Sequence, residues 1–163
     1  MKKITLLLSA FLVFATLKGY SQNTTESESL FNAKEFSLGL TTHKVLDQNY
    51  EANLYAGIGY SFTRNFLVEA EVPIYQKDSI AVDSVSFGAL YRYPVFTYFS
   101  PYLRIGVDYN WDNSDWDGYG GIGVSARIVK SWEIFSDINY SLEDFNNLSD
   151  GHFFVRGGIR LVF

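Results

Sequence analysis

The sequence predicts an all-β chain, an eight-stranded antiparallel up-and-down transmembrane β-barrel. From residue 35 onward, apolar and polar side chains alternate with a period of two, the periodicity of a strand with two different faces. The alternation fills eight segments of roughly ten residues, an even number that suits a closed meander. Within these segments the charged residues share one face and the apolar face carries none. Together these three observations favour a barrel that crosses a membrane.

The chain begins with a segment that we predict to be a signal peptide, residues 1–21. Two lysines follow the initiating Met, an apolar run extends from Ile4 to Leu17, and small residues precede a plausible cut before Gln22. The run is too short for a transmembrane helix, which needs ~20 apolar residues. Its removal would change the formal net charge from −5 to −8, because it takes away three lysines and no acid. The polar, low-complexity tract 22–34 is predicted to be a flexible periplasmic lead-in.

The predicted barrel domain is residues 35–163, and its first four strands alternate clearly. The first has three apolar side chains opposite Ser, Gly and Thr. The second has six apolar or aromatic side chains opposite a face rich in glycine, and the third alternates aliphatic residues with Glu69 and Glu71. The fourth alternates Val, Phe, Ala and Tyr with a face that includes Arg92. These strands are expected over residues 36–41, 52–62, 66–74 and 85–93.

The last four strands follow the same rule. The fifth opposes Leu, Ile, Val, Tyr and Trp to Arg104 and Asp108, and the sixth opposes four aliphatic residues to glycines, Ser and Arg127. The seventh is weaker, because Ser136 interrupts its apolar face. The eighth ends the chain on Phe163. These strands are expected over residues 102–111, 121–128, 134–142 and 152–163.

The predicted connections differ between the two ends of the barrel. At one end lie the short segments 63–65 and 129–132 and a longer aromatic-rich turn, 93–101. The other end holds longer polar loops, at residues 43–49, 76–83, 112–118 and 143–151. Outer-membrane barrels have their short turns in the periplasm and their long loops outside the cell. The pattern therefore predicts an outer-membrane location with both ends of the barrel chain on the periplasmic side.

Nine charged residues on the polar faces are predicted to form a luminal charge network. Five of the six arginines are among them, and Arg suits a confined interior because its planar guanidinium can bind a carboxylate bidentately. Side chains just fill an eight-stranded barrel, and buried charges must be paired, so a structural plug is favoured over an ion-conducting path. The predicted network is Glu69, Glu71, Arg92, Arg104, Asp108, Arg127, Asp137, Arg156 and Arg160.

Residues 35–163 resemble the small eight-stranded outer-membrane β-barrels, represented by the membrane domain of outer membrane protein A. The resemblance rests on the closing strand from Phe153 to Phe163, the segment 100–107 and the glycine-rich run 120–124. It implies a monomer embedded in outer-membrane lipid. It also implies that the terminal aromatic, Phe163, is part of the signal read by the outer-membrane assembly machinery. The resemblance supplies a fold and a location but no activity.

Several classes of function are excluded or disfavoured by composition and motifs. The chain has no Cys, which excludes a disulfide scaffold, a zinc-thiolate site and a Cys nucleophile. Its acidic balance argues against nucleic-acid binding, and no phosphate-binding glycine loop, zinc-protease motif or serine-hydrolase elbow is present. His43 and His152 are too few for a zinc site, and the acidic loop 112–118 departs from the EF-hand pattern. No cofactor is expected.

We therefore expect a non-enzymatic outer-membrane barrel with a structural, envelope-integrity or surface-interaction role, the last through its long loops. One alternative is a barrel-embedded lipid acyltransferase that modifies lipid A, since His43, Asp78 and Ser79 fall in the first two long loops. A lumen lined by arginines and carboxylates argues against it, because an acyl chain needs an apolar cavity. The other alternative is a soluble calycin-like barrel with its apolar face inside. The direction of Arg104 and Arg156 discriminates between the membrane and soluble forms.

Overall fold

The computed structural model describes residues 30–46, 52–75, 82–112, 114–142 and 151–163. The predicted signal peptide, the first part of the lead-in, and Asp78 and Ser79 lie outside the described residues. In the part of the chain that is described, no helix is long and apolar enough to cross a membrane. The strands are β1 (Glu35–Val45), β2 (Asn53–Ser61), β3 (Phe66–Tyr75), β4 (Ser84–Arg92), β5 (Phe99–Asn110), β6 (Asp115–Val129), β7 (Trp132–Leu142) and β8 (Gly151–Val162).

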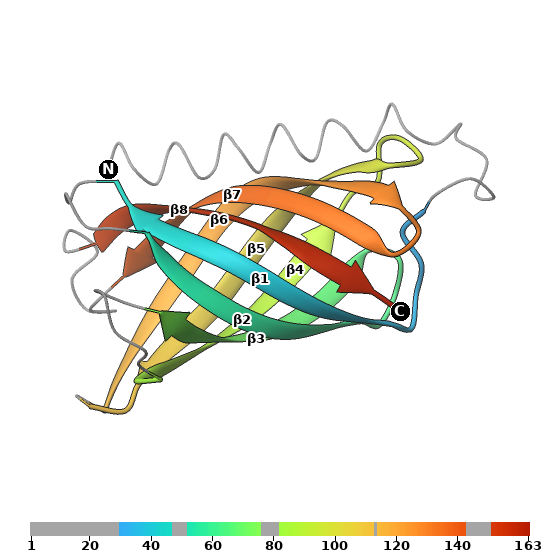
Figure 1. Ribbon diagram of the computed structural model, residues 1–163. Coiled ribbons are helices and arrows are strands. Elements are labelled where there is room, and N and C mark those ends of the chain that lie inside the picture. The colour runs from blue at the N-terminus through green and yellow to red at the C-terminus, as the bar shows by residue number, and fades with distance from the viewer. Residues whose placement is uncertain (1–29, 47–51, 76–81, 113, 143–150) are drawn as a thin grey trace, which may run out of the picture.

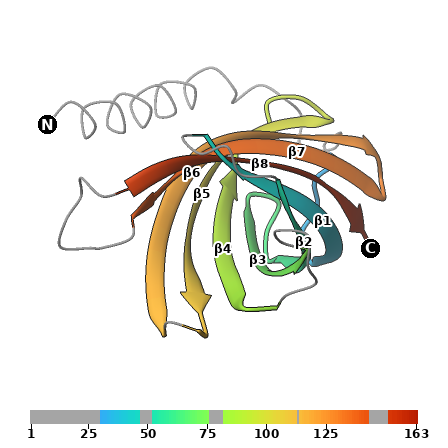
Figure 2. The ribbon, with the colours of Figure 1, turned by 60° about the vertical axis from the view of Figure 1, so that its left-hand side comes forward.

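The eight strands form a closed barrel in which each strand is antiparallel to its neighbours in the sequence (Figure 1). Closure is made by β1 and β8, whose register runs from Ser37 opposite Val162 to Val45 opposite Phe154. Each of the described strands pairs with a neighbour on both sides, which a spanning sheet requires because lipid offers no hydrogen bonds to a free edge. The predicted fold class is confirmed. Figure 2 shows the same barrel turned by 60°.

The two faces of the wall have opposite chemistry. β7 alternates almost perfectly between outward, exposed side chains and inward, buried ones, as its hydrophobic period predicts. The outward face of the barrel is apolar and highly exposed, with Phe36 at 64%, Ile58 at 63% and Ile105 at 67%. Exposed apolar side chains over a whole barrel wall are stable only where the surroundings are hydrocarbon. The wall therefore faces lipid.

Aromatic side chains gather at both rims of this wall. Near the short-turn end, the Tyr60 and Phe62 rings pack edge to face with centroids 4.9 Å apart. Near the other end, the Tyr109 ring lies 4.6 Å from Trp116, and Tyr140 lies 4.9 Å from Phe153. Amphipathic rings at both heights match the interfacial girdles of a membrane barrel.

The prediction of a loop over residues 112–118 is wrong. β6 begins at Asp115, and Trp116 pairs with Tyr109 of β5, so that the connection is only residues 111–114. The acidic composition of this segment is typical of a loop, yet Asp115, Trp116 and Asp117 pair in unbroken register with residues 108–110 of β5. The resulting β5–β6 hairpin has the longest strands among the described hairpins, and residues 115–118 belong to β6 rather than to a loop. In addition, β5 begins at Phe99 and β7 at Trp132, which shortens the predicted connections at the other end.

Candidate functional site

The charged side chains of the strands converge inside the barrel. All nine residues of the predicted network lie on inward-facing positions; eight of them are buried and Asp108 is half-buried. They come from six strands: the acids from β3, β5 and β7, and the arginines from β4, β5, β6 and β8. The lumen is therefore the site at which sequence and structure concentrate the polar chemistry of the chain.

Arg156 of β8 is the centre of the half of this network that lies nearer the long loops. Its Nη1 donates to Glu69 Oε1 at 2.5 Å and to Glu71 Oε2 at 2.9 Å, both across the lumen on β3. Its Nη2 donates to Asp137 Oδ2 at 2.9 Å on the neighbouring strand β7. Arg104 adds a bond from Nε to Glu69 Oε1 at 2.8 Å. Burying each of these charges without a partner would cost several kcal/mol, and this geometry supplies the partners.

Glu133 of β7 is the centre of the other half of the network, which lies nearer the short turns. It accepts from Arg92 Nη2 at 2.7 Å and from Arg160 Nη1 at 2.8 Å, and Arg127 Nη2 lies 3.4 Å away. Arg160 also donates to Glu69 at 2.7 Å, which joins the two halves into one chain of ion pairs along the barrel axis. Glu133 is absent from the predicted network because the seventh strand was expected to begin at Ile134, two residues after its actual start at Trp132. Its parity with Asp137, four residues on, was the signal that could have found it.

Neutral side chains complete the network. Tyr102 Oη donates to Asp137 Oδ2 at 2.5 Å, and Thr41 Oγ1 donates to Glu71 Oε1 at 2.7 Å. Guanidinium groups also stack on rings, with Arg160 Cζ 3.8 Å and Arg156 Cζ 4.8 Å from the Phe135 centroid. Such cation–π contacts gain strength where water is excluded. A small apolar cluster fills the space between the charged layers, consisting of Leu67, Leu90, Tyr102 and Phe135.

The two histidines lie near the long-loop end of the lumen. His43 stacks on Tyr55 with centroids 3.8 Å apart, and its Nε2 lies 3.4 Å from Glu71 Oε2. His43 and His152 both lie beside the Phe154 ring, at 5.8 and 6.3 Å between centroids. Among the residues that the structure describes, no three His, Cys, Asp or Glu side chains are grouped to hold a metal ion. His43 thus belongs to an aromatic layer between the ion pairs and the long-loop end of the barrel.

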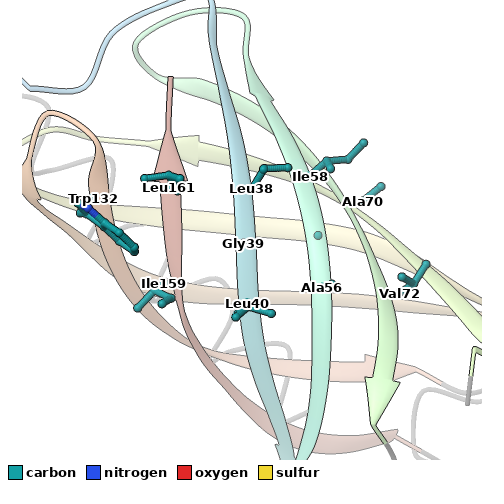
Figure 3. Close-up of a pocket in the computed structure, with 11 residues that line it drawn as sticks. Leu38, Gly39, Leu40, Ala56, Ile58, Ala70, Val72, Trp132, Ile159 and Leu161 are labelled. Atoms are coloured by element: carbon teal, nitrogen blue, oxygen red, sulfur yellow. The ribbon is translucent and has the colours of Figure 1, made fainter. Parts of the chain in front are cut away.

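The outer wall carries shallow apolar hollows rather than a polar cleft. One of them, about 610 Å³, lies over β1, β2, β3, β7 and β8, and Figure 3 shows its lining side chains. Gly39, Ala56 and Ala70 contribute little side chain there, while Leu38 lies beside Gly39 and Trp132 lies at the opposite edge of the hollow from Ala70. Arg104 and Arg156, in contrast, are fully buried inside the barrel. This arrangement excludes the soluble calycin-like alternative, because the apolar face is outside and the arginines are within.

The chain matches a protein-family model over most of its length. The family model described as "Outer membrane protein beta-barrel domain" matches residues 6–158. The chain belongs to this family. The predicted outer-membrane location is confirmed, and the outward apolar wall and charged lumen are those of an outer-membrane barrel. No curated protein sequence matches this family member significantly.

Solved structures of outer-membrane and designed barrels share the fold. The N-terminal β-barrel domain of Pseudomonas aeruginosa OprF matches with a TM-score of 0.64 at 13% identity, over 80% of this chain and 98% of that one. A de novo designed transmembrane β-barrel matches with a TM-score of 0.61 at 16% identity, over 81% and 98%. Pseudomonas aeruginosa OprG matches with a TM-score of 0.52 at 12% identity, over 83% and 99%. At these identities the likeness shows the fold of this family member alone.

Proposed function

We propose that this outer-membrane barrel is non-enzymatic and that its lumen is a structural core made of ion pairs. The observation that supports the proposal is Arg156, a fully buried guanidinium held by the carboxylates of Glu69, Glu71 and Asp137 from two strands. Each of these carboxylates has a further partner in the wall or lumen. The role that suits such an interior is mechanical: a rigid, monomeric element of the outer membrane that supports envelope integrity or presents its loops to a surface partner.

A conducting role is disfavoured by the energetics of the network. An ion that passed through the lumen would have to separate Arg156 and Arg160 from carboxylates at 2.5–2.9 Å. Breaking one buried pair costs about 3–5 kcal/mol, and several would have to open together. We therefore expect no steady conductance from the folded barrel in a planar bilayer.

Enzymatic lipid acylation is disfavoured as well. The interior offers ion pairs where an acyl chain would need an apolar slot, and His43 stacks on Tyr55 beside Glu71. The two other residues of that hypothesis, Asp78 and Ser79, lie outside the described residues. We expect the folded protein to transfer no acyl chain between lipids in vesicles.

The deciding experiment is complementation of a Gram-negative strain that lacks the gene. We expect the deletion to raise sensitivity to detergent and the wild-type chain to restore resistance. A second chain, in which residues 76–81 and 143–150 are replaced by short Gly-Ser turns, separates the two forms of the proposal. Resistance restored by this chain indicates a structural role, and resistance lost indicates a partner bound by the loops. Steady conductance or acyl transfer by the purified folded barrel would overturn the proposal.

A further inference from the structure

The residues immediately before β1 cross the short-turn mouth of the barrel from one wall to the other. At the near wall, the Lys34 amide donates to the Ser61 carbonyl oxygen at 2.6 Å. At the far wall, the Leu30 amide donates to the Thr97 carbonyl oxygen at 2.8 Å, and Arg127 Nη1 donates to the Leu30 carbonyl oxygen at 2.7 Å. Thr97 lies between β4 and β5, whereas β1 is bonded to β2 and β8. Residues 30–34, blue in Figure 1, therefore span the mouth, and we call them the stopper segment.

Phe31 is the part of the stopper segment that enters the barrel. Its side chain is fully buried, although it precedes the first strand. The ring centroid lies 5.4 Å from Arg92 Cζ and 5.1 Å from Arg127 Cζ, so the ring contacts two guanidinium groups at once. Each contact is within the range of a cation–π interaction. An apolar ring thus covers two arginines at this end of the charged lumen.

The layer that Phe31 covers has an excess of positive charge. Arg92, Arg127 and Arg160 share the buried carboxylate of Glu133, and Arg160 also reaches Glu69. The second acid of this layer is Glu35, which lies at the mouth and bonds Arg127 at 2.7 Å. Arg92 Nε and Arg127 Nε are buried and have no hydrogen-bond partner. The two arginines beside the ring therefore retain unused donors as well as charge.

We propose that the stopper segment is a displaceable seal of the periplasmic mouth and that the layer beneath it, formed by Arg92 and Arg127, binds small anions such as phosphate when the seal is lifted. A phosphate needs several N–H donors and a positive potential, and these guanidinium groups supply both. The inference goes beyond the proposed function, because lifting the seal leaves the central ion pairs of Arg156 in place. The lumen remains blocked above the site.

The absence of cysteine provides a direct test. Ser125 is the next inward position above Arg127 on β6, it is buried, and replacement by Cys is nearly isosteric. The Ser125→Cys barrel, folded in detergent, is treated with an anionic and with a cationic methanethiosulfonate reagent. With the seal intact we expect slow labelling. With Phe31→Ala added, we expect the anionic reagent to react about tenfold faster and to outpace the cationic one, because the local charge is positive.

Three further arms keep the proposal falsifiable. Leu30→Pro removes the amide that bonds Thr97 but keeps Phe31, so we expect it to accelerate labelling even if Phe31→Ala does not fold. Phe36→Ala, at a lipid-facing position 64% exposed, should leave the rate unchanged. Millimolar inorganic phosphate should slow the labelling of the opened barrel. An unchanged rate in both opened variants, faster reaction with the cationic reagent, or no protection by phosphate would overturn the inference. None of these readouts depends on conductance or envelope integrity, so the proposed function is tested separately.

Discussion

Removal of the Arg156 guanidinium is the sharpest test of the luminal core. In Arg156→Met, Glu69 keeps Arg104 and Arg160, and Glu71 keeps Thr41. Asp137 is left without a charged donor, because its remaining hydrogen bonds come from the neutral groups of Tyr102 and Asn139. A buried carboxylate left without its cation costs about 3–5 kcal/mol in the free energy of unfolding. We expect a loss of that size.

The assay is equilibrium unfolding in urea with the barrel in lipid vesicles, followed by tryptophan fluorescence and by the difference in gel mobility between heated and unheated samples. The double variant Arg156→Met with Asp137→Asn removes both members of the pair while keeping an acceptor for Tyr102. We expect it to recover about 2 kcal/mol of the loss, because neutral replacement of a buried pair is tolerated far better than removal of one partner.

The matched control is Lys130→Met in the exposed turn between β6 and β7, which should change the unfolding free energy by no more than about 0.5 kcal/mol. A cost under about 1 kcal/mol for Arg156→Met, or a double variant as unstable as the single one, would contradict a stabilising role for this buried ion pair.

Three more perturbations test other parts of the structure. Ile105→Arg places a charge mid-strand on the lipid-facing wall, and we expect it to lower the free energy of unfolding in vesicles by about 2–4 kcal/mol. Val129→Arg, at the end of β6, should lower it by only about 0–1 kcal/mol. Equal losses would contradict the orientation of the apolar wall toward lipid. Gly106→Ala drives a methyl group into a tyrosine ring and a carbonyl oxygen, so urea titration should show a loss of about 1–3 kcal/mol, whereas Gly120→Ala, with no atom nearer than 3.7 Å, should be near neutral. Glu133→Gln uncouples three guanidinium groups from their shared carboxylate; we expect about 3–5 kcal/mol of destabilisation by the same titration, and a wild-type value would show that these arginines do not need it.

The features of the fold that depend on local physics could be predicted from the sequence. A period-two contrast between oily and polar residues assigns each strand and both of its faces, and all nine predicted luminal residues lie on the inward face. Prediction failed where composition and periodicity disagreed. Asp115 and Asp117 suggested a loop, but their alternation with Trp116 belongs to β6. Glu133 was lost at a strand boundary, where assignment by pattern is least reliable.

Other features could not be read from the pattern at all. Which carboxylates Arg156 meets across the lumen depends on the tilt and stagger of the strands, and these are properties of the closed barrel rather than of any one segment. Phe31 gave only a faint signal, an aromatic residue in a polar tract. Its burial depends on a chain path across the mouth that no periodicity encodes.

The similarity to a designed barrel helps to explain why the fold could be predicted from the sequence whereas the luminal contacts could not. That chain matches at 16% identity, slightly above the 12% of OprG. Barrels made by design and by evolution must both alternate residues across the wall, close their edges and fill a narrow interior. What these rules share is architecture, so the likeness to the designed barrel gives the fold of this chain and not its function.

The distribution of charge among the strands has a consequence for assembly. The acids of β3, Glu69 and Glu71, and the arginines of β8, Arg156 and Arg160, are separated by more than eighty residues of chain and meet only across a finished cylinder. A sheet with fewer or more strands would set them at different heights and leave like charges facing one another. The final strand, β8, thereby delivers the counter-charges. Glu69 and Glu71 therefore receive these counter-charges in the same step as closure, which disfavours a sheet that lacks its last strand.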